Sequence, residues 1–236
     1  MDVLLEVDPA VAYPATAPEM GESPRHVRAQ FHAYGALSAH FAHRPDCYVG
    51  QELNVYYRPM PRTAFVVPDV MVCFGVDAGA IEQDVSYRIW DVGAPPALVL
   101  EIASGTTHGR DTDDKPAIYL EVGADEYWRF DPSGLGFYEP RLQGDRRAGD
   151  TWKPIEVVPD GDGRLVGRSG VLGLDVYAET HRLRFRDYRT GRWLSDPDDT
   201  RRERDAAEAR ATAAEARAKT AEAELAALRA RLNDQT

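Results

Sequence analysis

Apolar residues recur at intervals of three and four between Pro24 and about His43, which predicts an amphipathic helix. Ser23 precedes the pattern, and a hydroxyl followed by proline is typical of a helix start, because the hydroxyl caps free N–H groups and proline fixes φ. Arg44 and Pro45 follow its last apolar residue and end the helix. The stripe that we expect to face a core comprises Val27, Phe31, Tyr34, Leu37, Ser38 and Phe41.

Runs rich in Val, Tyr, Phe and Leu, with turn residues between them, predict strands over most of the following 150 residues. A short helix over residues 116–121 interrupts them, and Gly123 suits the left-handed conformation that follows a helix end. This order of elements predicts an α/β or α+β domain with a mixed sheet. The expected strands cover residues 47–57, 64–74, 97–103, 126–131, 137–142, 151–158 and 164–174, and a last hairpin over 183–194 turns at Thr190 and Gly191.

The chain changes character at about Asp198, where an alanine-rich segment with a heptad pattern begins. At about 1.5 Å per residue it would form a helix on the order of 50 Å long. The pattern predicts a coiled coil that joins subunits or binds a partner protein, parallel or antiparallel, with a solvated single helix as the alternative. The seam comprises Ala207, Ala211, Ala214, Ala218, Ala221, Leu225, Leu228 and Leu232. We therefore expect a disordered arm over 1–22, a domain over 23–195 and a coiled-coil helix over 198–236.

Composition narrows the class of protein. The hydrophobic content of 43% can supply a core, but no apolar stretch approaches the roughly 20 residues of a membrane span. The first ten residues are acidic and carry too short an apolar run for a secretory signal. Cys47 and Cys73 lie 26 residues apart, which excludes a disulfide scaffold and a four-cysteine zinc site. We expect a cytoplasmic protein without a membrane partner.

The net charge of −11 opposes tight nucleic-acid binding, and residues 1–200 carry 20 basic against 32 acidic residues. A nucleic-acid site there would need a local basic patch or bound metal ions. The segment from His181 to Trp193 interleaves arginines with aromatic residues and could contact a phosphate backbone. A hairpin with one solvated face is the alternative. The five arginines are Arg182, Arg184, Arg186, Arg189 and Arg192.

Two acids interrupt apolar strands. Alternation places Asp69 on one face of residues 66–74 and Glu101 on one face of residues 98–103, each among apolar neighbours. Burying an ionised carboxylate is unfavourable unless a cation or several donors compensate it. Two such acids on adjacent strands would suit a divalent metal ion, which takes carboxylates, water and phosphate oxygens. Alternatively, Asp69 only follows Pro68 at the start of a strand, and Glu101 faces solvent or an arginine.

Lys115 stands at the start of the predicted short helix, with Tyr119 four residues on and on the same face. A lysine near two metal-bound carboxylates can stabilise developing negative charge. The alternative is an exposed lysine that balances the three aspartates of residues 111–114. The small-residue loop over 104–109 does not match a phosphate-binding P-loop, and no nucleophile elbow or dinucleotide fingerprint is present.

Five segments in order resemble the Uma-family restriction endonucleases of the PD-(D/E)XK nuclease superfamily. The resemblance covers roughly residues 45–195. It implies a restriction-endonuclease-like core, with a mixed central sheet flanked by helices. The matching segments are Val67–Gly75, Ser86–Trp90, Pro95–Ser104, Lys115 with Tyr119, and Gly123–Pro132.

The resemblance also implies roles for individual residues. Asp69 matches the acid of the PD element and Glu101 the acid of the (D/E)XK element, and both would bind Mg²⁺ or Mn²⁺. The backbone carbonyl of Ile102 would be a further ligand. Glu52 matches a position where relatives often carry an acid ahead of the PD strand, and would complete the site.

The lysine of the motif would fall at position 103, where this chain has Ala103. In this family the lysine has moved to the following helix, which makes Lys115 the catalytic candidate. The implied activity is Mg²⁺-dependent hydrolysis of phosphodiester bonds in DNA, with RNA as an alternative substrate. Ala103, Pro116 and the acidic surface motivate a second hypothesis, a catalytically inactive scaffold that acts through its C-terminal coiled coil.

Overall fold

The computed structural model describes residues 23–105 and 107–233, so the predicted arm over 1–22 lies outside the described residues. The chain divides into two compact units, residues 1–196 and 197–236. The second unit contains one helix, α6 (Pro197–Asn233), close to the helix expected there. A search of the described helices finds none with the length and apolar character of a membrane span.

The first helix begins as predicted. It is α1 (Pro24–Phe41), and the Ser23 hydroxyl oxygen accepts a hydrogen bond from the His26 amide at 3.2 Å. The predicted stripe is correct toward the end of the helix, where Leu37 and Phe41 are buried, and wrong near its start, where Val27 and Phe31 are 50% and 54% exposed. The helix instead turns small alanines to the sheet, so close approach of the backbone selects the buried face. The buried residues are His26, Ala29, Gln30, His32, Ala33, Ala36, Leu37 and Phe41.

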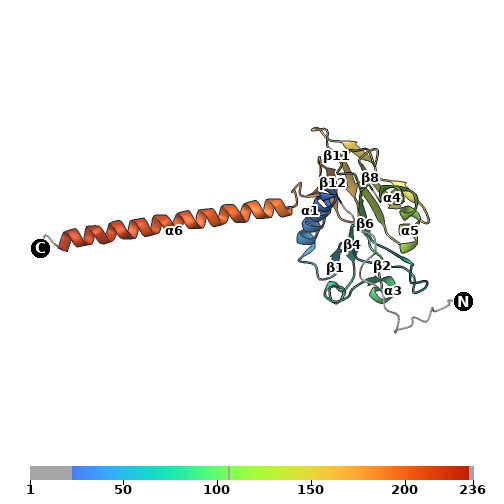
Figure 1. The fold of residues 1–236 in the computed structure, drawn as a ribbon, viewed down its shortest axis with the longest axis horizontal. Helices are drawn as coiled ribbons and strands as arrows, with labels where there is room; N and C mark the ends of the chain where they lie inside the picture. The colour runs from blue at the N-terminus through green and yellow to red at the C-terminus, as the bar shows by residue number, and fades with distance from the viewer. Residues whose placement is uncertain (1–22, 106, 234–236) are drawn as a thin grey trace. The chain divides into compact units, whose positions relative to one another are not determined.

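A six-stranded sheet forms the centre of the first unit, in the order β1-β4-β6-β7-β8-β9. Only β6 and β7 pair in parallel and the other neighbours are antiparallel, so the sheet is mixed, as predicted. Figure 1 shows helices on both sides of it. Its strands are β1 (Cys47–Gly50), β4 (Val70–Phe74), β6 (Leu98–Ile102), β7 (Glu126–Phe130), β8 (Leu142–Arg147) and β9 (Trp152–Pro154).

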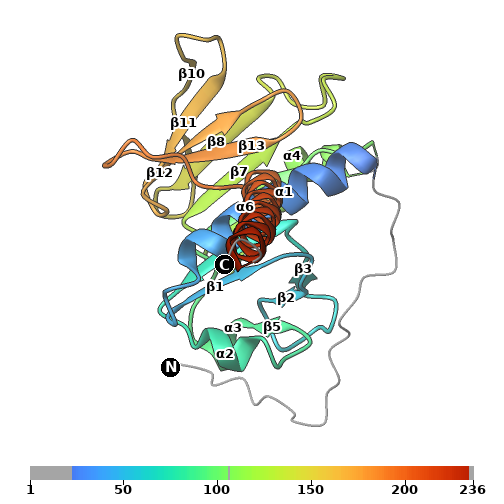
Figure 2. The same cartoon turned by 90° about the vertical axis from the view of Figure 1, so that its left-hand side faces the viewer.

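Two smaller sheets lie toward opposite ends of this unit (Figure 2). The four-stranded sheet is formed by β10 (Val157–Pro159), β11 (Leu165–Ser169), β12 (Leu174–Ala178) and β13 (Leu183–Asp187). The three-stranded sheet is formed by β2 (Val55–Tyr56), β3 (Phe65–Val66) and β5 (Tyr87–Arg88). The short helices are α2 (Ala78–Ile81), α3 (Ile89–Val92), α4 (His108–Asp113) and α5 (Lys115–Val122).

Three local predictions can be compared directly with these elements. The strand expected over 137–142 is wrong, because β8 starts at Leu142 and continues through charged residues that are held by pairing with β7 and β9. The single strand expected over 164–174 is split into β11 and β12. The last hairpin is confirmed: Arg186 pairs with Trp193, and Gly191 adopts φ 70° at the turn.

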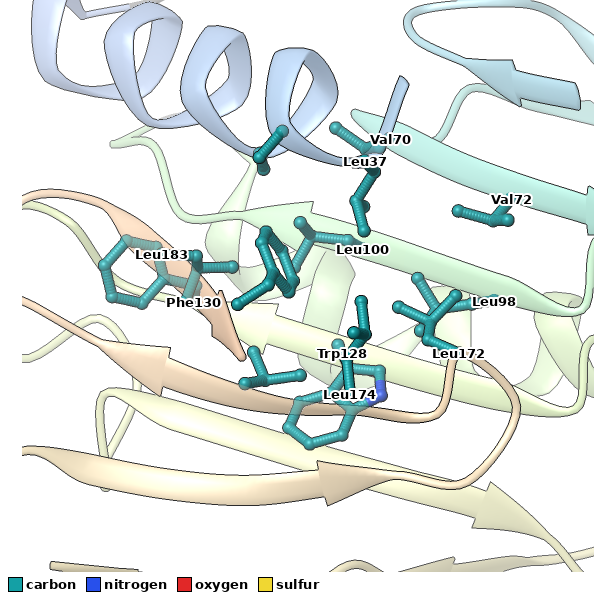
Figure 3. Packing of buried hydrophobic residues seen from close by; sticks show 14 of the residues in the cluster. Leu37, Val70, Val72, Leu98, Leu100, Trp128, Phe130, Leu172, Leu174 and Leu183 are labelled. Carbon is teal, nitrogen blue, oxygen red and sulfur yellow. The ribbon is translucent and has the colours of Figure 1, made fainter. Parts of the chain in front are cut away.

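Alternate residues of the central strands enter two separate cores. On one face, Val70, Leu100 and Phe130 pack with α1 and with β12 and β13 (Figure 3). On the other face, Met71 and Val99 pack with residues of α5. Figure 1 shows α1 and α5 on opposite sides of β4 and β6. Alternation therefore turns residue 101 toward α5, onto the second face.

Candidate active site

Asp69 and Glu101 lie next to each other at the ends of two adjacent antiparallel strands. Val70 pairs with Leu100, so the next position along the ladder sets Asp69 opposite Glu101. The Ile102 amide donates a hydrogen bond of 2.6 Å to Asp69 Oδ2, which ties the two strand ends together. The structure thus brings the two predicted acids together.

Glu101 is 1% exposed, and its partners come from α5. Lys115 Nζ lies 2.8 Å from Glu101 Oε2, and the Tyr119 hydroxyl donates to Glu101 Oε1. Glu101 therefore faces neither solvent nor an arginine, and Lys115 is buried rather than exposed. Pro116 occupies the first turn of α5, where its missing N–H is tolerated, and so it does not displace Lys115 from the site.

Sequence reasoning missed Asp111. This fully buried carboxylate lies on α4, with Oδ1 2.9 Å from Lys115 Nζ, and its Oδ2 accepts a hydrogen bond of 2.6 Å from the Tyr138 hydroxyl. The Tyr127 hydroxyl donates to the Asp111 carbonyl at 2.7 Å. The sequence did contain one indication of this contact: Asp111 precedes Lys115 by four residues, a spacing at which two side chains lie close together in helical structure. We call Asp69, Glu101, Asp111 and Lys115 the acid cluster.

Two residues of α1 reach Asp69 from the other side and were also missed. His26 Nε2 lies 3.4 Å from Asp69 Oδ1, and the Gln30 amide donates to the Asp69 carbonyl at 3.0 Å. Both belong to the helix face that the predicted stripe left outside the core. Asp69 is consequently fixed by α1 and by β6 at once, while its side chain remains 16% exposed.

The acid cluster combines three carboxylates with one ammonium group. Burial raises the pKa of Glu101 well above its ordinary value; Lys115 opposes this shift, and Asp69 and Asp111 add to it. Burial acts to lower the pKa of Lys115, but the carboxylates of Glu101, Asp111 and Asp69 outweigh it, so that pKa is raised. A surplus of negative charge in a buried place can be relieved by an additional cation.

The donor set fits a hard divalent cation, because Asp69 and Glu101 offer carboxylate oxygens and Mg²⁺ needs only one or two of these besides water. In residues 23–105 and 107–233, no group of three or more His, Cys, Asp or Glu side chains is arranged to hold a metal. Glu52 is exposed, and its backbone amide donates to the Pro68 carbonyl at 3.1 Å beside the start of β4. Ile102 is fully buried. The structure therefore places Glu52 and Ile102 near the acids without showing them as ligands.

Three of the five arginines in residues 181–194, which we call the arginine hairpin, pair with acidic side chains of β12 or of the residues that follow the hairpin. Arg182 lies 2.7 Å from Asp196, and Arg186 lies 3.1 Å from Asp175. Arg184 lies 3.6 Å from Asp196 and stacks over Trp193. The other two arginines of the predicted patch, Arg189 and Arg192, are exposed. The basic surface is thus smaller than the five arginines suggest.

A mixed sheet with paired acids at adjoining strand ends, and a lysine from the following helix beside them, is consistent with a nuclease-like class of protein. The family model described as "Uma2: Putative restriction endonuclease" matches residues 15–176, and the chain belongs to this family. The resemblance predicted from the motifs is confirmed. The match contains the whole acid cluster, and it ends before the arginine hairpin and α6. Membership supports a nuclease-like function and therefore a hydrolase acting on nucleic acid.

The chain is also similar to a solved structure described as a "putative nuclease belonging to DUF820 from Anabaena variabilis ATCC 29413". The identity is 15% and the TM-score is 0.42, over 61% of this chain and 77% of that one. No curated protein matches the sequence significantly.

Proposed function

We propose that the protein is a metal-dependent endonuclease that hydrolyses phosphodiester bonds in DNA, with Asp69, Glu101 and Lys115 as its catalytic residues. One observation carries the proposal. Glu101 is buried between Lys115 and Tyr119, and Asp69 lies beside it, next to the residue of β4 that pairs with Leu100. A buried carboxylate with an ammonium partner and surplus negative charge around it is typical of functional sites.

Asp69 and Glu101 would hold Mg²⁺ or Mn²⁺, with the Ile102 carbonyl and Glu52 as further candidates. A bound divalent ion would supply an acidified water molecule and partial neutralisation of the phosphate. The Ile102 amide fixes one oxygen of Asp69, and Tyr119 fixes one oxygen of Glu101, so both carboxylates are oriented before substrate binds. Orientation before the reaction lowers the reorganisation that the transition state requires.

Lys115 would stabilise negative charge that develops on the scissile phosphate. Its raised pKa keeps the ammonium protonated at neutral pH. Asp111 holds Lys115 Nζ at 2.9 Å and so limits where the ammonium can move. Burial also raises the pKa of Tyr119, so its hydroxyl remains a donor to Glu101.

Substrate binding by the arginine hairpin is part of the proposal. Arg189 and Arg192 are its exposed members and are the first candidates for phosphate contact, because Arg182, Arg184 and Arg186 lie against acids. We also propose a cytoplasmic location, which the two free, buried cysteines support.

The test is nicking of supercoiled plasmid by the full chain with Mg²⁺, with Mn²⁺ and with EDTA. Cleavage should require the metal and should be lost in Asp69→Asn, Glu101→Gln and Lys115→Met. Glu126→Gln is the matched control, because Glu126 is also 1% exposed but lies outside the acid cluster. Cleavage that survives both acid substitutions would refute the site.

Single-stranded and double-stranded DNA and RNA oligonucleotides, offered in parallel, identify the substrate. Cleavage of RNA alone would replace DNA in the proposal. No cleavage of any substrate, together with no Mn²⁺ binding, would favour the inactive scaffold instead.

A further inference from the structure

α6 carries an apolar seam, and the seam side chains that the structure describes are exposed. In heptad notation Ala211, Ala218 and Leu225 occupy a positions, and Ala207, Ala214 and Ala221 occupy d positions. The preceding a and d positions hold Arg204 and Thr200, so the seam begins at Ala207. A seam of this length on one side of a helix is suited to pairing with another helix.

The charges beside the seam show which helix would fit. In a parallel pair, the residue at a g position faces the e residue five places further along the second helix. Arg210 and Arg217 occupy g positions, and Glu215 and Glu222 occupy the matching e positions. A second copy of α6 would therefore set Arg210 against Glu215 and Arg217 against Glu222, twice each by symmetry.

The next g-to-e pair along the sequence also joins opposite charges, but here the g residue is acidic and the e residue is basic. Position 224 is Glu and position 229 is Arg, so the g-to-e pairing is again between opposite charges. Upstream, Glu203 would face Glu208, and this like-charged pair falls where the seam ends at Arg204. Charge matching thus extends over the same heptads as the apolar seam.

An antiparallel pair would match these charges poorly. It brings e positions against e positions and g positions against g positions. The e positions are Glu208, Glu215, Glu222 and Arg229, and the g positions include Arg210, Arg217 and Glu224, so an antiparallel pair sets like charges against each other at some of these positions, whereas the parallel pair sets opposite charges at each from 210 to 229. Charged residues at these positions also favour two strands, because a wider bundle would bury them.

The charged residues beside the seam that the structure describes do not form ion pairs within α6 itself, except near its start. Within the part of α6 whose side chains the structure describes, ion pairs occur only near its start. They join Arg201 to Asp198, Arg202 to Asp199 and Arg204 to Asp205.

We propose that α6 forms a parallel, in-register, two-stranded coiled coil with α6 of a second copy of this chain. The connection at Asp196 and Pro197 would then bring two copies of the first unit to the same end of the helix pair. If the proposed function holds, such a pair carries two active sites, one available for each strand of a duplex. The pairing itself does not depend on that activity.

Cysteine cross-linking of the full chain tests the register. Ala211→Cys and Ala218→Cys place a thiol in the seam, while Ala216→Cys places one at the outer f position as the control. The native Cys47 and Cys73 are buried and should not contribute. Both seam variants should form disulfide-linked dimers under mild oxidation, and the control should not. An antiparallel pair can bring only one of the two seam positions against itself, so linkage of one alone would overturn the proposal.

Charge-reversal variants test the proposed helix pairing, and their molecular mass in solution is measured by light scattering. Wild type should have twice the mass of one chain. Glu215→Arg with Glu222→Arg, and separately Arg210→Glu with Arg217→Glu, should each shift the protein to a monomer. An equimolar mixture of these two variants should restore the dimer, because the pairs 210–215 and 217–222 are then again opposite in charge.

Circular dichroism confirms that each variant remains helical, so loss of the dimer is not loss of the helix. A wild type that is monomeric at every concentration, a trimer or tetramer, or a mixture that stays monomeric would overturn the proposal. Mass is measured without substrate or metal, so these outcomes are separate from failure of the endonuclease proposal.

Discussion

Glu126 and Glu101 lie on the two neighbouring strands β7 and β6, are equally buried, and face opposite sides of the central sheet. Glu126 faces the side of α1 and the four-stranded sheet. It accepts hydrogen bonds from Trp128 Nε1 at 2.9 Å, Ser169 Oγ at 2.6 Å and the Gly170 amide at 2.8 Å. Neutral donors from two sheets therefore satisfy this carboxylate, and it ties those sheets together.

Glu101 faces the side of α5 and has a different kind of partner. An ammonium and a phenol hold it, and two further carboxylates lie in the same cluster. The carboxylate of Glu126 is satisfied by a fixed set of neutral donors, whereas the acid cluster keeps surplus negative charge. The comparison teaches that burial of an acid does not by itself mark a functional site. The charge balance around the acid distinguishes the two glutamates.

The largest expected difference between the two glutamates is in the rate of DNA cleavage. Glu101→Gln should reduce metal-dependent nicking by roughly 10²–10³-fold or more, a loss typical of removing one charged group that acts in the transition state. Glu126→Gln should leave the rate per folded molecule unchanged. The two variants are compared by initial rates at a temperature where both are folded. Equal losses would show that the two carboxylates have the same role.

The free energy of unfolding should be affected in the opposite order, with the larger loss in Glu126→Gln. Glu126→Gln sets an amide nitrogen among buried donors and should lower the free energy of unfolding by roughly 1–3 kcal/mol. Glu101→Gln should lower it less, because it also removes one negative charge from the acid cluster. Urea denaturation without metal measures both, and an equal slope with denaturant is the control for a comparable unfolding transition. A larger loss in Glu101→Gln would contradict the comparison.

Stability without metal should also depend on pH through Glu101. Its pKa is raised in the folded state, so between the ordinary and the raised pKa the native protein binds a proton that the unfolded chain does not. Stability should therefore fall as pH rises through this window, by up to about 1.4 kcal/mol per pH unit. Glu101→Gln removes this contribution, so the difference between wild type and variant is the readout. A difference that is flat with pH would contradict it.

The smallest expected effect belongs to Tyr119. Tyr119→Phe removes the hydroxyl that orients Glu101 and should destabilise the fold by about 1 kcal/mol. Nicking should fall by up to about tenfold, since 1.4 kcal/mol in the barrier corresponds to that factor. Tyr87→Phe is the matched control, because Tyr87 is also fully buried and its hydroxyl donates to the Ala94 carbonyl, outside the acid cluster. Its nicking rate should not change.

Strand periodicity made the centre of the site predictable. Alternation fixes the face of each residue in a strand, so apolar runs around Asp69 and Glu101 were enough to place both acids on inward faces. The ordered motifs then paired the two strands. The helical spacing of four set Tyr119 on the same face as Lys115, and the family resemblance made Lys115 the catalytic candidate.

The rest of the site depends on contacts that no local pattern encodes. His26 and Gln30 reach Asp69 because α1 packs through alanines, whereas hydrophobicity alone favoured the face of Val27 and Phe31. Asp111 was missed because α4 is a short polar helix without an apolar period. The predicted basic patch was too large for a similar reason. The acidic partners of its arginines come from a neighbouring strand and from residues beyond the hairpin, which the local sequence pattern does not show.

Calorimetric titration of Mn²⁺ into the purified full chain tests the central claim most directly. Wild type and Glu126→Gln should bind the ion with millimolar or tighter affinity, and Asp69→Asn and Glu101→Gln should not. Absence of binding in wild type, or unchanged binding in Glu101→Gln, would show that the acid cluster is not a metal site.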